Sequence, residues 1–74
     1  MLKDTFIDIY CGPKSYKSDL NKFQPKSSEE ELLKNYYDRI TYMLAEGLHG
    51  SLTDQDYKQW AKLLDDILEK LGVR

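Results

Sequence analysis

From residue 28 onward, apolar residues recur at intervals of three and four in two blocks, with a short glycine-containing segment between them. This spacing puts an apolar side chain on the same face of a helix at every turn, so it predicts two amphipathic helices, at about 28–48 and about 54–71. The apolar positions are 33, 36, 37, 40, 43 and 44 in the first block and 57, 60, 64, 67, 68 and 71 in the second. Helices joined by a short loop fold back on each other, so we expect an antiparallel hairpin.

Residues that favour helix N-termini precede both blocks. Ser27 and Ser28 each stand three residues before a glutamate, which is the capping-box spacing, and three consecutive glutamates suit the positive end of a helix dipole. Thr53 is the expected N-cap of the second helix. Leu52 and Tyr57 then stand at the spacing of a hydrophobic staple, in which the residue before the cap packs on the second turn.

Glycines follow both blocks. Many helices end at a residue in the left-handed backbone conformation, which glycine adopts without steric cost. We therefore expect the first helix to end at Gly47 or Gly50 and the second at Gly72.

The apolar arc of each predicted helix is wide. At ~100° per residue it covers about 160° in the first helix, with Leu32 and Leu48 at its edges, and about 140° in the second, between Leu63 and Leu68. A seam between two helices alone needs a narrower stripe, so each helix should touch a third body. Apolar residues nearer the N-terminus can supply it within the chain: Phe6, Ile7, Ile9, Tyr16, Leu20 and Phe23. A second copy can cover whatever they leave exposed.

The first 26 residues admit two interpretations. The segment FIDIYC has the β-branched and aromatic residues of a strand, yet Leu2, Phe6, Ile9 and Tyr10 also fit one face of a helix. A strand needs a hydrogen-bonding partner, and no second strand candidate exists in this chain. A short helix is therefore favoured over a strand that pairs with its copy in another molecule.

A second short helix is expected where Tyr16, Leu20 and Phe23 stand at helical spacing, ending before Pro25. The chain is thus predicted to be an all-α, small helical bundle. It forms one domain over 1–74, in which an N-terminal arm (1–26) with short elements packs against a helical hairpin (27–74).

Composition narrows the classes of protein. The chain has 74 residues, with 11 basic and 13 acidic side chains and a net charge of −2, which does not favour nucleic acid as a partner. No apolar run reaches the ~20 residues that span a bilayer, and the N-terminus lacks a signal-peptide pattern. Cys11 is the only cysteine, so no disulfide can form within the chain, and a reducing cytoplasm is the expected location. Cys11 and His49 are too few for a zinc site, so no metal or cofactor is expected.

Each residue with a reactive side chain has a structural interpretation that requires no chemistry. His49 stands at the end of a predicted helix, where a structural role at the terminus is expected. Cys11 precedes Gly-Pro in a predicted turn and is expected to be a buried or idle thiol. The glutamates at 29–31 and the pair Asp65-Asp66 are expected to be solvated, because adjacent helical residues point ~100° apart rather than into one cleft. We therefore expect no enzymatic activity.

Aromatic residues are the remaining signal, with six Tyr, two Phe and one Trp. Tyr and Trp suit interfaces because they bury a large area and keep a polar tip. We expect Tyr36, Tyr42, Tyr57 and Trp60 to be shared between self-association and a partner, with Tyr42 on the far side of its helix. The leading hypothesis is a small protein-interaction module and homodimer, a stoichiometric inhibitor of a host protein of the kind that phages and mobile elements carry. That hypothesis rests on analogy of size and class.

Two alternatives stay open. One is a small nucleic-acid-associated regulator that uses Lys14, Lys17, Lys22 and Lys26 for phosphates, with Tyr16 and Phe23 for base stacking. The other is a structural subunit or an immunity-type protein. A helix–turn–helix is disfavoured because Asp54 and Asp56 at the start of the second helix would repel phosphates.

Overall fold

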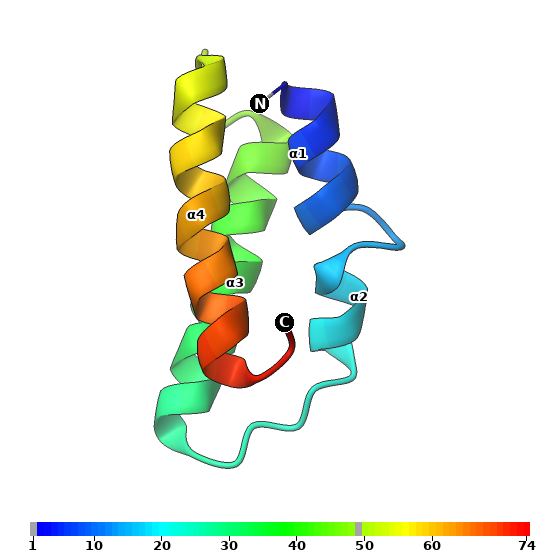
Figure 1. Cartoon of the computed structure of the whole chain (residues 1–74), viewed down its shortest axis with the longest axis vertical. Helices are drawn as coiled ribbons and strands as arrows, with labels where there is room; N and C mark the ends of the chain where they lie inside the picture. The colour runs from blue at the N-terminus through cyan, green and yellow to red at the C-terminus, as the bar shows by residue number, and fades with distance from the viewer. Residues whose placement is uncertain (1, 49) are drawn as a thin grey trace.

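Four helices make up the regular structure of residues 2–48 and 50–74, the part of the chain that the computed structural model describes. They are α1 (Lys3–Tyr10), α2 (Tyr16–Asn21), α3 (Ser28–Glu46) and α4 (Asp54–Leu71). The two long helices, α3 and α4, lie antiparallel, and the two short ones follow each other along one side of the hairpin (Figure 1). The predicted all-α bundle, with its hairpin and short N-terminal elements, is confirmed.

The N-termini of the long helices follow the predicted capping residues. The Ser27 hydroxyl accepts a hydrogen bond from the Glu30 amide at 3.3 Å, whereas the Glu30 carboxylate accepts from the Lys26 amide at 2.9 Å, one residue before the cap. At α4 the exchange is reciprocal: the Thr53 hydroxyl accepts from the Asp56 amide and the Asp56 carboxylate from the Thr53 amide. Both ends therefore have partners for amides that the helix itself leaves open.

Glycines end both long helices, and only the C-terminus of α3 differs slightly from expectation. Gly47 ends α3 in the left-handed conformation, with φ of 70°, so the helix stops two residues before the predicted position 48. Gly72 ends α4 in the same conformation, with φ of 76°, and the predicted range 54–71 is confirmed. An alanine in this conformation is strained, which explains why a glycine stands at each end.

The N-terminal segment is a helix, as favoured, and not a strand. Phe6 and Tyr10 face the interior, because they stand one turn apart on the same side of α1. The predicted inward face was too broad: Leu2 remains 64% exposed and Ile9 37% exposed. Leu2 precedes the first turn, and Ile9 is rotated by ~100° from Tyr10. Helices this short are not stable alone in water, so packing on the hairpin holds α1 in place.

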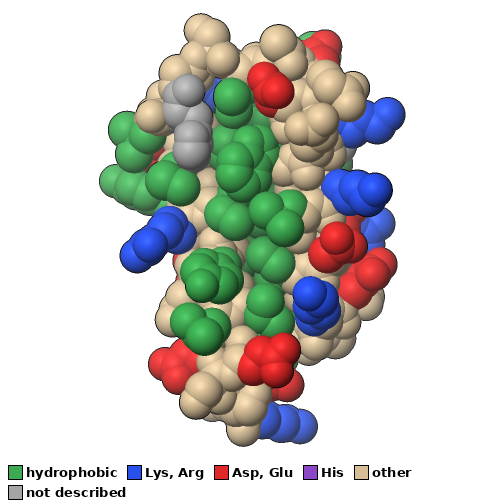
Figure 2. Space-filling model, turned by 90° about the vertical axis from the view of Figure 1, so that its left-hand side faces the viewer, with side chains coloured by type: hydrophobic (Ala, Val, Ile, Leu, Met, Phe, Trp, Pro, Cys, Tyr) green, Lys and Arg blue, Asp and Glu red, His purple; other side chains and the backbone are tan. Residues whose placement is uncertain are grey.

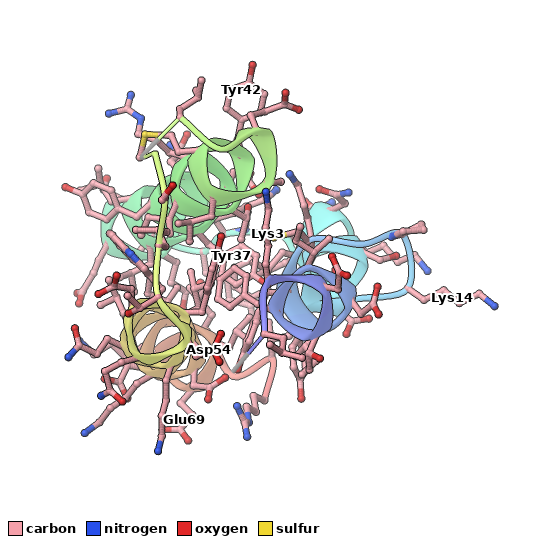
Figure 3. All side chains as sticks on the ribbon, turned by 90° about the horizontal axis from the view of Figure 1, so that it is seen from above. Lys3, Lys14, Tyr37, Tyr42, Asp54 and Glu69 are labelled. Carbon is pink, nitrogen blue, oxygen red and sulfur yellow. The ribbon has the colours of Figure 1, made fainter. Side chains whose placement is uncertain are left out.

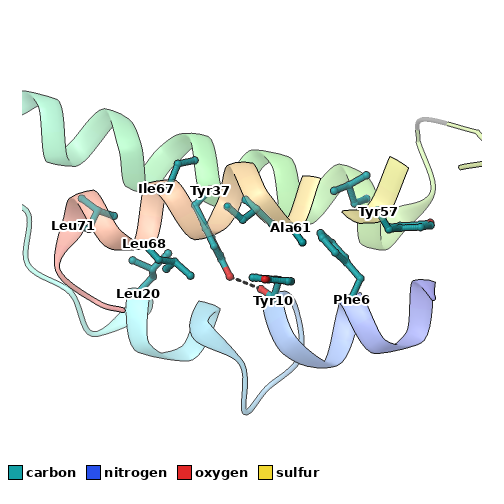
Figure 4. Close-up of a cluster of buried hydrophobic side chains, with 11 residues drawn as sticks. Phe6, Tyr10, Leu20, Tyr37, Tyr57, Ala61, Ile67, Leu68 and Leu71 are labelled. Atoms are coloured by element: carbon teal, nitrogen blue, oxygen red, sulfur yellow. Dashed lines mark hydrogen bonds between the residues drawn. The ribbon is translucent and has the colours of Figure 1, made fainter. Parts of the chain in front are cut away.

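One core joins all four helices (Figure 4). Its members are Phe6 and Tyr10 of α1, Leu20 of α2, Tyr37 and Leu44 of α3, and Tyr57, Ala61, Leu64, Ile67, Leu68 and Leu71 of α4. Leu52, before the Thr53 cap, packs against this cluster at the predicted position of the staple. Helices α1 and α2 thus supply the expected third body on one side of the hairpin. On the opposite side of the hairpin, none of the described helices gives such cover (Figure 1).

Candidate protein-binding surface

The uncovered side of the hairpin carries large apolar side chains. Leu32 is 52% exposed, Tyr36 51% and Leu63 43%. Half-buried apolar residues lie near them on the same faces of α3 and α4, namely Ile40, Met43 and Trp60. We call these six residues the outer stripe. Figure 2 shows apolar side chains along most of this side of the molecule, with charged side chains at the borders.

The helical period explains where the outer stripe lies. Tyr36 and Met43 directly precede buried residues of α3, and Trp60 and Leu63 directly precede buried residues of α4. A residue one position earlier in the sequence lies ~100° further around the helix axis, and this rotation has the same sense in both helices. Antiparallel helices in a hairpin are related by an approximate two-fold axis, so the same rotation turns both sets toward the same side. That side is opposite α1 and α2 (Figures 1 and 2).

A hollow of about 280 Å³ opens within this surface. Its lining residues are Asp56, Gln59, Trp60 and Leu63, which come from the first three turns of α4. The volume is below that of most small-molecule sites, which start at ~300 Å³. A hollow of this size with an indole wall and two polar residues suits a single side chain of a protein partner.

The four predicted interface residues do not form one surface. Tyr36 and Trp60 belong to the outer stripe, and Tyr42 is 57% exposed as predicted, but it points away from the core on another side of α3 (Figure 3). Tyr57 lies in the core at 6% exposure, with its ring centroid 5.4 Å from that of Phe6. Tyr57 is therefore not available to a partner in this fold, because α1 covers its position.

Sequence reasoning did not select Leu32 and Leu63 as binding residues. They stood at the edges of the predicted apolar arcs, which were expected to be covered by the N-terminal segment or by a second copy. The arc widths were the signal that more apolar surface existed than two helices can hide. Which edge stays exposed depends on where α1 and α2 pack.

The lysines of the nucleic-acid alternative lie around α2, away from the outer stripe. Lys14, Lys22 and Lys26 are exposed and Lys17 is half-buried. The two predicted stacking residues are engaged elsewhere: Tyr16 and Phe23 are half-buried and pack against the core. The Tyr16 ring also lies 6.2 Å from that of Tyr10, centroid to centroid. Neither ring offers an open face like those on which bases stack in single-strand binding proteins.

A polar cluster ties the C-terminal end of α4 to α1. The Tyr10 hydroxyl donates a hydrogen bond of 2.7 Å to Asp65, which also forms an ion pair with Arg74. The Arg74 guanidinium lies over the Tyr16 ring, 5.9 Å from its centroid. The prediction of a solvated Asp65-Asp66 pair is therefore wrong for Asp65, because the packing of α1 brings the Tyr10 hydroxyl to it. Asp66 is exposed, as expected.

Two buried tyrosines have raised pKa values. The Tyr37 hydroxyl donates to the backbone oxygen of Tyr10 at 2.7 Å, and burial raises the pKa of Tyr37 (Figure 4). Burial, followed by the hydrogen bond to Asp65, raises the pKa of Tyr10 to about 12. Burial favours the neutral phenol of both tyrosines, because the charged form would lose hydration. In Tyr10 the charged form would also face the Asp65 carboxylate.

Stability is expected to fall as the pH rises from about 10 to about 12. An unfolded tyrosine loses its proton near pH 10, whereas folded Tyr10 keeps it to about 12. The folded state then binds more protons than the unfolded state, so the free energy of unfolding decreases with rising pH in this window and is unaffected below it. Urea titrations across the window should show this slope. The slope should be smaller in Tyr37→Phe and unchanged in the exposed control Tyr42→Phe. A free energy of unfolding that stays constant across this window would contradict the raised pKa values.

Of the other two candidate groups, only Cys11 lies within the described residues. Cys11 is half-buried, with its sulfur 3.7 Å from the backbone oxygen of Thr41, and burial raises the pKa of the thiol more than Lys17 lowers it. It is therefore a neutral thiol at pH 7, as expected of an idle cysteine. His49 lies outside the described residues, and its role at a helix terminus stays a prediction. Over residues 2–48 and 50–74, no three His, Cys, Asp or Glu residues group as metal ligands would.

None of the helices in the described part of the chain is long and apolar enough to cross a membrane. The chain matches no protein-family model, no curated protein and no solved structure with which it was compared.

Proposed function

We propose that the protein acts by binding another protein through the outer stripe. It would occupy a surface of a host protein stoichiometrically, in the manner of the small inhibitors carried by phages and mobile elements. The exposure of Leu32, Tyr36 and Leu63, at 43–52% each, is the observation that carries the proposal. Covering such side chains is favourable by ~25 cal/mol for each Å² of apolar area removed from water.

The composition of the outer stripe supports a protein as the ligand. Contiguous exposed apolar surface on a small domain is typical of interaction sites. Aromatic residues and methionine are enriched in protein interfaces, and Tyr36, Trp60 and Met43 supply them here. Trp60 borders the hollow, so a partner side chain seated there would contact a large aromatic face, as at binding hot spots. Asp56 and Gln59 supply the polar rim.

Inhibition by this route requires only occupation of the target surface. One molecule is consumed for each target, and the effect is reversed when the complex dissociates. The same surface therefore sets both affinity and specificity, and no reacting group is needed.

Affinity capture tests the proposal with a matched pair of variants. The double substitution Tyr36→Lys with Leu63→Lys places two charges in the outer stripe, and Tyr42→Lys with Leu48→Lys does the same on exposed apolar residues outside it. From a lysate of the source organism, the wild-type protein and the second variant should retain one protein in a constant ratio, and the first variant should lose it. The residues whose truncation costs ~2 kcal/mol or more cluster near the centre of an interface, and tenfold in affinity corresponds to ~1.4 kcal/mol. Two charges placed there should therefore weaken binding of the purified pair by at least tenfold.

Salt separates the proposal from the nucleic-acid alternative. Binding to nucleic acid weakens by orders of magnitude between ~50 and ~200 mM salt, whereas an apolar contact should change much less. Equal retention of the partner by both variants would argue against the outer stripe. Recovery of nucleic acid alone, lost at the higher salt, would favour the lysine-rich segment.

A further inference from the structure

One row of α4 residues on the uncovered side carries opposite charges at its two ends. Asp56, Leu63 and Lys70 are spaced by seven residues, so they lie two turns apart at nearly the same angle around the helix. Leu63, in the middle, is 43% exposed. The row is therefore acidic at one end, apolar at its centre and basic at the other end.

The middle of this row belongs to the outer stripe. Leu63 is seven residues from Asp56 and seven from Lys70, so it lies halfway between the two charges along α4. A two-fold axis beside Leu63 would therefore bring each charge of one copy to the height of the opposite charge of the other copy.

We propose that a second copy of this chain covers the outer stripe in the free protein. A two-fold axis beside Leu63 sets the two α4 helices antiparallel. Asp56 of each copy then faces Lys70 of the other, and the two hairpins form a four-helix arrangement. A parallel arrangement would set Asp56 against Asp56 and Lys70 against Lys70, which like-charge repulsion disfavours.

The dimensions of the molecule suit this occupant. Its extents are 36 × 21 × 18 Å, and the uncovered side is bounded by the first and last of these (Figure 2). A face of that size is close to the ~800 Å² per partner that a standard stable interface buries.

The dimer bears on the proposed function through the shared surface. If the target also binds the outer stripe, the dimer must dissociate before the target can bind, and raising the protein concentration opposes target binding. The dimer itself is measured in the absence of any target, so each proposal can fail without the other. A monomeric protein that still binds its target through the outer stripe would overturn the dimer alone.

Disulfide cross-linking tests the geometry. In a Cys11→Ser background, Leu63→Cys places a thiol beside the proposed axis, and Lys58→Cys places one on a different, exposed face of α4. A disulfide needs Cα atoms within ~7 Å of each other. Under mild oxidation, Leu63→Cys should therefore give a covalent dimer and Lys58→Cys should remain monomeric. Failure of Leu63→Cys to cross-link, with the folded state verified by circular dichroism, would overturn the proposed axis.

Solution mass over a dilution series tests the charge pattern. The wild-type protein should convert from dimer to monomer on dilution. Lys70→Glu sets an acidic residue against Asp56 of the other copy at both ends of the interface, and should weaken the dimer roughly five- to tenfold at low salt. Lys62→Glu makes the same charge change on another face of α4 and should change the dissociation constant less than about twofold. A wild-type protein that stays monomeric at all concentrations, or equal effects of the two substitutions, would overturn the proposal.

Discussion

The Tyr37→Ala variant should be largely unfolded at 25 °C. Tyr37 has no exposed area, and its ring fills the space between α3 and α1 (Figure 4). Replacing a buried aromatic residue with alanine costs ~3–5 kcal/mol, because contacts are lost and a cavity remains. A single core in a chain this short supplies only ~3–5 kcal/mol of net stability. Circular dichroism with urea titration should show loss of helix without denaturant.

Two neighbouring substitutions separate the causes of that effect. Tyr37→Phe keeps the ring but removes the hydroxyl that donates to the backbone oxygen of Tyr10, so it should cost about 1–3 kcal/mol and leave the protein folded. Tyr36→Ala changes the adjacent residue, which is 51% exposed, and should cost less than ~1 kcal/mol. If Tyr37→Ala and Tyr36→Ala proved equally stable, the position of α3 in the fold would be wrong.

Phe6→Ala should have a similarly large effect, by detaching α1. The Phe6 ring is fully buried, and its centroid lies 5.0 Å from that of Tyr10 and 5.4 Å from that of Tyr57. We expect a loss of ~3–5 kcal/mol in the free energy of unfolding. The hydrogen bond between Tyr10 and Asp65 should be lost with it, since α1 is too short to persist without packing.

The control for this effect lies in the same helix. Ile9 is 37% exposed, so Ile9→Ala should cost much less than Phe6→Ala. Hydrogen exchange distinguishes local from global loss. In a stabilising osmolyte that keeps Phe6→Ala folded, its α1 amides should lose more protection than its α4 amides. Equal protection of α1 in both variants would be inconsistent with Phe6 as its anchor.

The core that these substitutions test also accounts for the candidate surface. Helices α1 and α2 are short and cover one side of the hairpin only. In residues 2–48 and 50–74 no helix lies on the other side, so the outer stripe remains open (Figure 1). The placement of α1 and α2 therefore sets both the core and the exposed apolar surface.

Local sequence signals predicted the hairpin well. Ser27 and Thr53 act as the N-caps, and Gly47 and Gly72 end the helices, because these residue types satisfy helix ends through their own side chains or backbone freedom. The choice of helix over strand for α1 was also correct. It followed from the absence of any strand partner in the sequence, which is a property of the whole chain rather than of local propensity.

The sequence by itself therefore determined which segments are helical, from periodicity, roughly where the long helices begin and end, from their capping residues, and how wide their apolar arcs are. Only the tertiary structure decided which part of each arc is covered. Tyr36 and Tyr37 are adjacent and chemically identical, yet one is 51% exposed and the other fully buried, because α1 and α2 pack on one side of the hairpin. Tyr57 is buried and Leu63 is exposed for the same reason. The spacing of apolar residues gives the angle of each side chain about the axis of its helix. The side on which a third helix packs is set by contacts among segments that are distant in sequence.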